Sequence, residues 1–144
     1  MCPSRRDFLI SSTAAAWSSS RILGANERVQ VGFIGYGLIG AEHVHNFKNQ
    51  WDVDIVAVSD VYQPRLEQGR AACGPRVRGY RDFRRLLDDK DVQAVVISTP
   101  DHWHALMTIM ACASGKDVYV EKPMTLFVRA GTCEARAALM TGRR

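Results

Sequence analysis

The sequence predicts an α/β fold, a doubly wound three-layer structure in which helices cover both faces of a parallel sheet. Segments with the patterns of strands and helices alternate along the 144 residues, which is typical of this class. Residues 93–98 form a nearly unbroken apolar run, as expected of a parallel strand that is covered on both faces. For this architecture we expect the strand order 3-2-1-4-5.

The first part of the chain reads as strand, helix and strand. Residues 29–34 form a short apolar strand. A glycine-rich turn leads into a helix over residues 38–49, which places Val44 on its inner side. Residues 52–59 form a second apolar strand, which ends immediately before Asp60.

The middle of the chain predicts two helices around a short strand. A helix over residues 64–73 begins with a proline in its first turn and ends at a Gly-Pro pair. Residues 76–80 form a third strand, and Asp82 caps a helix that runs to residue 87.

The last part of the chain completes the alternation. After the fourth strand at residues 93–98, a helix over residues 101–114 carries apolar side chains at helical spacing, and we expect it to bury Trp103. Residues 117–120 form a fifth strand, and residues 126–140 form the last helix.

The turn after the first strand has the spacing G-x-G-x-x-G and consists of Gly35, Tyr36, Gly37, Leu38, Ile39 and Gly40. In a dinucleotide-binding turn, the first glycine permits the tight turn, the second lets a pyrophosphate approach the backbone, and the third lets the helix lie close to the strand. The N–H groups at the start of the helix favour the anionic phosphates. The alternative is a glycine-rich turn that only packs a strand–helix–strand unit.

The second half of the same fingerprint is an acid at the end of the second strand. Asp60 lies about twenty residues after the turn, where a ribose-binding carboxylate is expected. The joint match predicts a Rossmann-type nucleotide-binding domain. Asp60 favours NAD, because a carboxylate accepts from a ribose hydroxyl and repels a 2′-phosphate, whereas the nearby Arg65 leaves NADP open.

Two further segments follow strands and therefore lie at the same carboxyl edge of the sheet. They read Thr-Pro-Asp-His-Trp-His from Thr99 and Glu-Lys-Pro from Glu121. With the glycine turn and Asp60, in this order and spacing, they resemble the Gfo/Idh/MocA family of NAD(P)-dependent oxidoreductases over residues 29–140. The Glu-Lys-Pro triplet after a fifth strand is the most specific part of the resemblance.

The resemblance implies roles for individual residues. Lys122 matches the catalytic lysine, which lies beside the nicotinamide and manages the proton of the reacting hydroxyl. Glu121 and Pro123 hold its backbone, often with a cis bond before the proline. Thr99, Pro100 and His104 match the segment along the nicotinamide half of the cofactor. Without its flanking residues, Lys122 would read only as an exposed lysine at the end of a strand.

Metal binding is not expected. His102 and His104 are two residues apart, as are His43 and His45, and side chains with this spacing on a helix do not face each other. No cluster of cysteines or carboxylates completes a metal shell around either pair.

Composition and charge limit the classes of partner that the chain can bind. The chain is 47% hydrophobic and 24% charged with a formal net charge of +4, and it can bury one core. Arginines cluster between residues 76 and 85, but no stacking series of aromatic residues and no nucleic-acid motif accompanies them. We therefore expect a solvated basic face and no nucleic-acid partner.

Residues 1–25 have the order of features found in an export signal. Arg5 and Arg6 precede a short, mildly apolar run, rich in Ser and Ala, that extends to Ser20. This pattern resembles the twin-arginine signal, which directs proteins to the periplasm. The apolar run is too short to span a membrane. The alternative is an arginine-bearing tail, and in that case we expect a cytoplasmic protein.

These interpretations predict an exported oxidoreductase that transfers hydride between NAD, or NADP, and a hydroxyl of a sugar or polyol. Members of the family continue into a second α/β domain that supplies most of the substrate pocket. We therefore expect residues 26–144 to bind the cofactor without turnover, and the uncovered sheet edge to favour a homo-oligomer. Two alternatives stay open: a nucleotide-binding remnant without catalysis, and a glycosidase-like enzyme that uses NAD for a transient oxidation.

Overall fold

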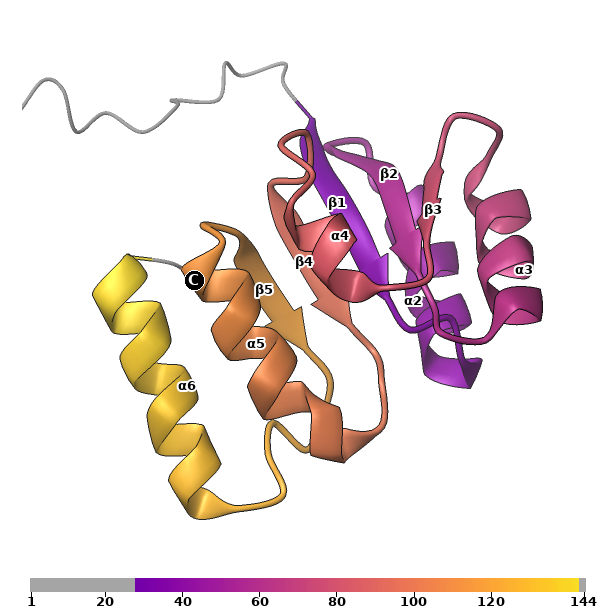
Figure 1. The fold of residues 1–144 in the computed structure, drawn as a ribbon. Coiled ribbons are helices and arrows are strands. Elements are labelled where there is room, and N and C mark those ends of the chain that lie inside the picture. Colours follow the sequence, from indigo (N-terminus) through magenta and orange to yellow (C-terminus); the bar gives the residue numbers. More distant parts are fainter. Residues whose placement is uncertain (1–27, 143–144) are drawn as a thin grey trace, which may run out of the picture.

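A computed structural model describes residues 28–142, and the predicted export signal at residues 1–25 lies outside this range. Strands and helices alternate along the described chain (Figure 1). In chain order the elements are β1 (Val29–Ile34), α2 (Leu38–Lys48), β2 (Val53–Ser59), α3 (Gln63–Cys73), β3 (Arg78–Tyr80), α4 (Phe83–Leu87), β4 (Ala94–Ile97), the 3-10 turn η2 (Asp101–Trp103), α5 (His104–Ala113), β5 (Asp117–Val120) and α6 (Val128–Thr141). The alternation predicted from the sequence is confirmed, with small shifts at the ends of elements.

The strands form one five-stranded sheet in the order β3-β2-β1-β4-β5, and all neighbours are parallel. This confirms the predicted strand order. β1 lies at the centre, where Phe33 pairs with Val58 of β2 and Val96 of β4. Because all strands run in the same direction, their carboxyl ends meet at one edge, which is where open α/β sheets bind ligands.

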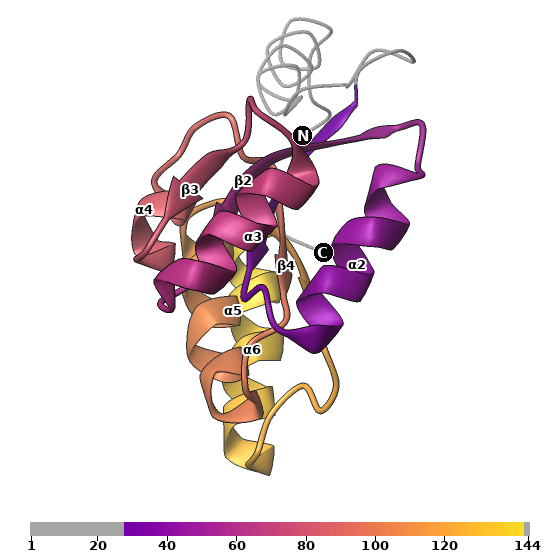
Figure 2. The same ribbon diagram turned by 90° about the vertical axis from the view of Figure 1, so that its right-hand side faces the viewer.

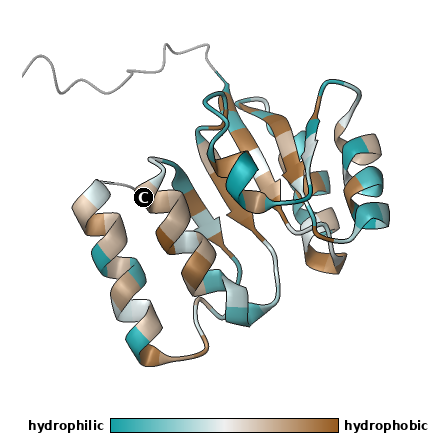
Figure 3. Cartoon of the chain, viewed as in Figure 1, coloured by the Kyte–Doolittle hydropathy of each residue, from teal (hydrophilic) through white to brown (hydrophobic). Residues whose placement is uncertain are grey.

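Two apolar clusters, one on each face of the sheet, hold the layers together. On one face, Val44 of α2 packs with Phe33, and on the other, Leu86 of α4 and Met107 of α5 pack with Ile97. Figures 1 and 2 show α2 and α3 on the first side and α4 and α5 on the second. The central strands carry many of the strongly hydrophobic residues (Figure 3). The sheet is therefore covered on both faces, as the apolar run at residues 93–98 predicted.

The predicted helix over residues 101–114 begins with the 3-10 turn η2, and the α-helix α5 starts only at His104. The helical spacing of 3.6 residues per turn does not hold across a 3-10 turn, so side chains before His104 point elsewhere. Trp103 is 42% exposed. The prediction that Trp103 belongs to the core was therefore wrong.

The last helix, α6, starts at Val128 rather than at residue 126 and continues through Gly131 to Thr141. It packs alongside α5 beyond the β5 end of the sheet (Figure 1). This contact brings Glu134 of α6 into the interior, where it is 2% exposed. Among residues 28–142, no helix combines the length and apolar character that a membrane crossing requires.

Candidate functional site

A cleft of about 690 Å³ opens at the carboxyl edge of the sheet. Eight of the residues predicted from the sequence lie on its wall: Gly35, Gly37, Leu38, Ile39, Asp60, Arg65, Thr99 and Pro100. They come from the ends of β1, β2 and β4 and from the first turns of α2 and α3. The parallel sheet thus brings together segments that are far apart in the sequence.

The glycine turn connects β1 to α2 by a close backbone approach. Gly35 has a φ of +93°, a value that residues with a side chain rarely adopt, and a Cβ on Gly40 would overlap the carbonyl oxygen of Gly35. A Cβ on Gly37, by contrast, would meet only the Nη1 atom of Arg65, at 3.9 Å. The backbone of Gly37 therefore faces open cleft, where an anionic group can approach it.

Asp60 holds the edge of the glycine turn. Its side chain is nearly buried; one carboxylate oxygen accepts the N–H of Tyr36 at 2.8 Å, and the other accepts the N–H of Tyr62 at 2.8 Å. Each oxygen keeps a second acceptor site for a ligand hydroxyl. Tyr36 takes part in this arrangement through its backbone N–H, whereas its ring lies against Gly69 of α3.

The cleft has a second wall that the sequence analysis did not assign to the site. It includes Trp103 from η2, and Arg81 and Arg84 from the segment around α4. Hydrogen bonds from Arg84 lower the pKa of the Asp82 carboxyl to about 2, so Asp82 balances part of this positive charge. Arg76, Arg81 and Arg84 are exposed, as predicted, but the arginines between residues 76 and 85 do not share one face. Arg81 and Arg84 line this cleft, whereas Arg76 and Arg78 line a cavity at the opposite edge.

The Glu-Lys-Pro segment follows β5 and lies at the same edge as the cleft. The peptide bond between Lys122 and Pro123 is cis, as the resemblance implied. Neither Glu121 nor Lys122 is among the residues that line the cleft. One carboxylate oxygen of Glu121 lies 2.9 Å from the Nε2 atom of His43 on α2, and the other accepts the N–H of Lys122 at 3.2 Å. Hydrogen bonding from His43 is the main cause that lowers the pKa of the Glu121 carboxyl. His43, which the sequence analysis weighed only as a metal ligand, therefore ties α2 to the backbone of Lys122.

His104 is buried behind the cleft wall and is not part of its surface. Its ring nitrogens lie 2.7 Å from the carbonyl oxygen of Thr99 and 2.7 Å from that of Pro123. The ring therefore links the segment after β4 to the segment after β5. No motif in the sequence signals this link, because it depends on how α5 sits between the two segments.

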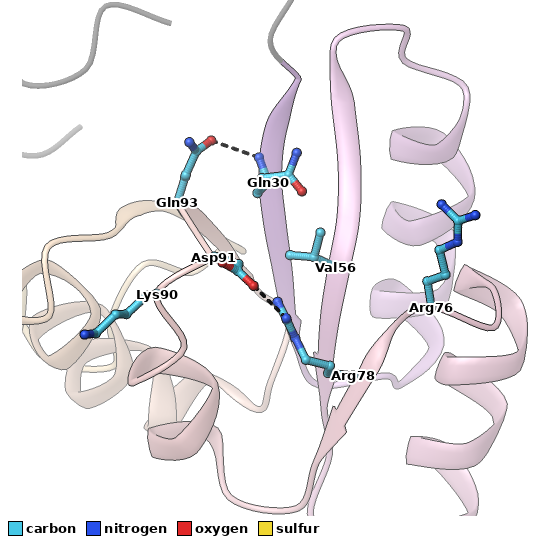
Figure 4. Close-up of a pocket in the computed structure, with 7 residues that line it drawn as sticks. All are labelled: Gln30, Val56, Arg76, Arg78, Lys90, Asp91 and Gln93. Atoms are coloured by element: carbon cyan, nitrogen blue, oxygen red, sulfur yellow. Dashed lines mark hydrogen bonds and ion pairs between the residues drawn. The ribbon is translucent and has the colours of Figure 1, made fainter.

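A second cavity, of about 360 Å³, lies at the opposite, amino-terminal edge of the sheet and is lined by Gln30, Val56, Arg76, Arg78, Lys90, Asp91 and Gln93 (Figure 4). Four of its polar residues contact each other in two pairs. Gln93 accepts the N–H of Gln30 at 3.0 Å, and Arg78 pairs with Asp91 at 2.7 Å (Figure 4). In the described part of the chain, no three His, Cys, Asp or Glu side chains gather as a metal shell.

The residues of the cleft fit a dinucleotide. The volume is in the range of cofactor pockets, the open backbone at Gly37 suits a phosphate, and Asp60 offers acceptors to ribose hydroxyls. The second cavity has neither an open helix start nor a comparable turn, so the cleft at the carboxyl edge is the candidate site.

Comparisons with known proteins agree with this geometry. The profile of an oxidoreductase family with an NAD-binding Rossmann fold matches residues 29–143. Glycosyl hydrolase family 109 protein 1 from Shewanella sp. (strain ANA-3) is 36% identical over 110 residues, which are 71% of this chain and 24% of that protein. Inositol 2-dehydrogenase from Salmonella paratyphi B is 31% identical over 107 residues, which are 74% of this chain and 31% of that protein.

Solved structures show the same fold. An NAD binding oxidoreductase from Klebsiella pneumoniae superposes with a TM-score of 0.74 at 30% identity, over 81% of this chain and 33% of that one. The WlbA dehydrogenase from Chromobacterium violaceum, in complex with NADH and UDP-GlcNAcA, superposes with a TM-score of 0.79 at 22% identity, over 85% of this chain and 36% of that one. The chain thus spans between a quarter and about a third of the length of these relatives. It belongs to the Gfo/Idh/MocA oxidoreductase family, in the part that forms the NAD-binding Rossmann fold.

Proposed function

We propose that the chain provides the cofactor site and the proton-handling lysine of an oxidoreductase that acts on a hydroxyl of a sugar or polyol. The observation that carries this proposal is the placement of Lys122 and the glycine turn at the same edge of one parallel sheet. One of the relatives is an inositol 2-dehydrogenase, which supports a polyol as the substrate class.

Each residue would have a defined task. The N–H groups at the start of α2, beside Gly37, would hold the pyrophosphate, and Asp60 would accept hydrogen bonds from ribose hydroxyls. NAD, when bound, accepts or returns a hydride. Lys122 would hold the substrate oxygen at its Nζ atom and take or return the hydroxyl proton. Glu121 and His43 would keep the backbone of Lys122 in place.

A glycosidase-like function is the second candidate. The relatives named glycosyl hydrolase family 109 are 36–38% identical to this chain, a higher identity than that of the inositol dehydrogenase. In such an enzyme, as we proposed from the sequence, the oxidation is transient, so the cofactor returns to its starting state. The two candidates therefore differ in whether reduced nicotinamide accumulates.

The test combines binding and turnover. Binding is measured by titrating NADH into the 144-residue chain. Turnover is measured on the full protein that the gene encodes, by following the absorbance of reduced nicotinamide with inositol, other polyols and sugars. Lys122→Ala should keep NADH binding and abolish turnover, whereas Lys90→Ala, a matched exposed lysine at the opposite edge, should change neither. Turnover that survives Lys122→Ala contradicts the proposed role, and glycoside cleavage without net reduction favours the second candidate.

The location of the protein is a separate proposal. We infer export through the twin-arginine route, supported by Arg5 and Arg6 ahead of a weakly apolar run. Replacing both arginines by lysine should leave a fused reporter in the cytoplasm, while Arg21→Lys should leave its export unchanged. A reporter that still leaves the cytoplasm after the double replacement would show that this interpretation is wrong.

A further inference from the structure

We propose that Arg65 binds the pyrophosphate of the cofactor, with its guanidinium reaching from α3 to the glycine turn and holding the phosphate oxygens there. The inference rests on the proposed function, because it takes the cleft as a dinucleotide site. It gives Arg65 a task that the sequence did not suggest, since from the sequence this arginine favoured a 2′-phosphate and left NADP open.

The first step is the position of the guanidinium. Gly37 precedes α2, and among the described residues a Cβ built on it would meet only the Nη1 atom of Arg65, at 3.9 Å. In a dinucleotide-binding turn, this second glycine is the one whose backbone the pyrophosphate approaches. The guanidinium of Arg65 therefore lies beside the space that a bound pyrophosphate would occupy.

The packing of α3 against the turn brings the side chain to this position. Arg65 and Gly69 are four residues apart on α3, so they lie on the same face of the helix. A Cβ on Gly69 would come within 2.9 Å of the Tyr36 ring and 3.0 Å of Val58. Glycine at this position therefore lets α3 lie close to the glycine turn, and the same face of α3 carries Arg65 one turn nearer to the cleft.

The three arginines that line the cleft differ in what their side chains already bind. Arg84 pairs with Asp82 at 2.6 Å, and Arg81 donates to the carbonyl oxygen of Val61 at 3.4 Å. Among residues 28–142, no hydrogen bond or ion pair engages the side chain of Arg65. A guanidinium always carries its charge, so Arg65 is the arginine whose charge and donors are available to a ligand.

The groups opposite Arg65 also favour an anion. The first turn of α2 contains no acidic residue, and no side chain caps the start of this helix at Gly37. The start of a helix leaves N–H donors unpaired and carries a partial positive charge. With these donors on one side and the guanidinium on the other, the space suits a pyrophosphate, whose oxygens accept paired hydrogen bonds from an arginine.

This placement determines which ligands Arg65 strengthens. An arginine that contacts a 2′-phosphate strengthens the binding of NADPH alone. An arginine on the pyrophosphate strengthens NADH, NADPH and ADP-ribose alike, because all three contain this group. Arg65 should therefore raise affinity without favouring either cofactor, and the preference for NAD remains with Asp60, whose carboxylate repels a 2′-phosphate.

The test compares the affinities of the 144-residue chain for NADH, NADPH and ADP-ribose. Arg65→Gln removes the charge, and Arg76→Gln, at an exposed arginine of the opposite edge, is the matched control. We expect Arg65→Gln to weaken all three ligands by a common factor of about tenfold, and Arg76→Gln to leave them unchanged. A loss confined to NADPH would assign Arg65 to the 2′-phosphate and overturn the inference, as would unchanged affinities.

A second measurement separates a direct contact from an effect on folding. Salt screens a contact between a guanidinium and a phosphate, so the NADH affinity of the unmodified chain should fall more steeply with NaCl concentration than that of Arg65→Gln. Urea unfolding should give the same midpoint for both chains, because the Arg65 side chain is exposed. An equal salt dependence would overturn the inference. If the unmodified chain binds neither NADH nor ADP-ribose, the proposed function fails and the inference falls with it, whereas binding that Arg65→Gln leaves unchanged removes the inference alone.

Discussion

Gly37→Ala should weaken cofactor binding while leaving the fold intact. Gly37 precedes α2 with a φ of −83°, which alanine adopts without strain, and a Cβ there would meet only Arg65, at 3.9 Å. Restricting the unfolded chain stabilises such a variant by about 0.4–1 kcal/mol. Alanine is a weaker N-cap than glycine, which offsets part of this gain. The free energy of unfolding should therefore change by less than about 1 kcal/mol.

The effect on binding is larger, because the new methyl group stands where the pyrophosphate must approach the backbone. Forcing an additional methyl group into a close contact costs about 1–3 kcal/mol. This free energy corresponds to NADH binding that is about 5-fold to 150-fold weaker. The assay is a fluorescence titration with NADH, together with urea unfolding of the same preparation.

Gly40→Ala is the matched comparison within the same turn. Its Cβ would overlap the carbonyl oxygen of Gly35, which is backbone and cannot move aside easily. We expect this variant to lose about 1–3 kcal/mol of unfolding free energy, or more, and to bind weakly as a result. If Gly37→Ala binds NADH as tightly as the unmodified chain, or unfolds as readily as Gly40→Ala, the assignment of Gly37 to the phosphate site is refuted.

Three further changes test other parts of the structure. Asp60→Ser should narrow the difference between NAD and NADP affinities, and equal affinities in the unmodified chain would remove the basis for this expectation. His43 lowers the pKa of the Glu121 carboxyl below its ordinary value of 4.5. The ionised carboxylate therefore stabilises the fold when the pH is above 4.5, and this stabilisation is lost as the pH falls through the lowered pKa. His43→Ala should therefore flatten the acid side of a stability–pH curve measured by urea unfolding; an unchanged slope would contradict the pair. Lys116→Met removes the hydrogen bonds from the Lys116 Nζ atom to the carbonyl oxygens of Asp89 and Val92. It should lower the unfolding free energy by about 1–3 kcal/mol in urea unfolding. An unchanged urea midpoint would contradict these hydrogen bonds.

The strand order, the glycine turn and Asp60 were predictable because their signals are local. Apolar runs and glycines at fixed spacing reflect what each short segment needs, and Asp60 follows directly from the end of a strand. Trp103 was misplaced because a 3-10 turn interrupts the helical spacing on which the prediction relied. The contact of His43 with Glu121 joins residues 78 positions apart, which a single sequence does not reveal.

The same reasoning explains why the burial of His104 and Glu134 was not predicted. His104 was assigned to the cofactor surface from the resemblance, whereas its contacts depend on the depth at which α5 packs. Glu134 lies on a helix whose sequence shows no functional motif, and only the packing of α6 against α5 buries it. Tertiary packing, rather than periodicity, decides such placements.

The central claim is that the cleft at the carboxyl edge, and not the cavity at the opposite edge, binds NAD. Mapping amide chemical shifts of the 144-residue chain during titration with NADH tests this claim most directly. The account predicts saturable shifts at Gly35, Gly37 and Asp60, with Gln30 and Lys90 unchanged. Shifts confined to Gln30 and Lys90, or no saturable shifts at the glycine turn, would contradict it.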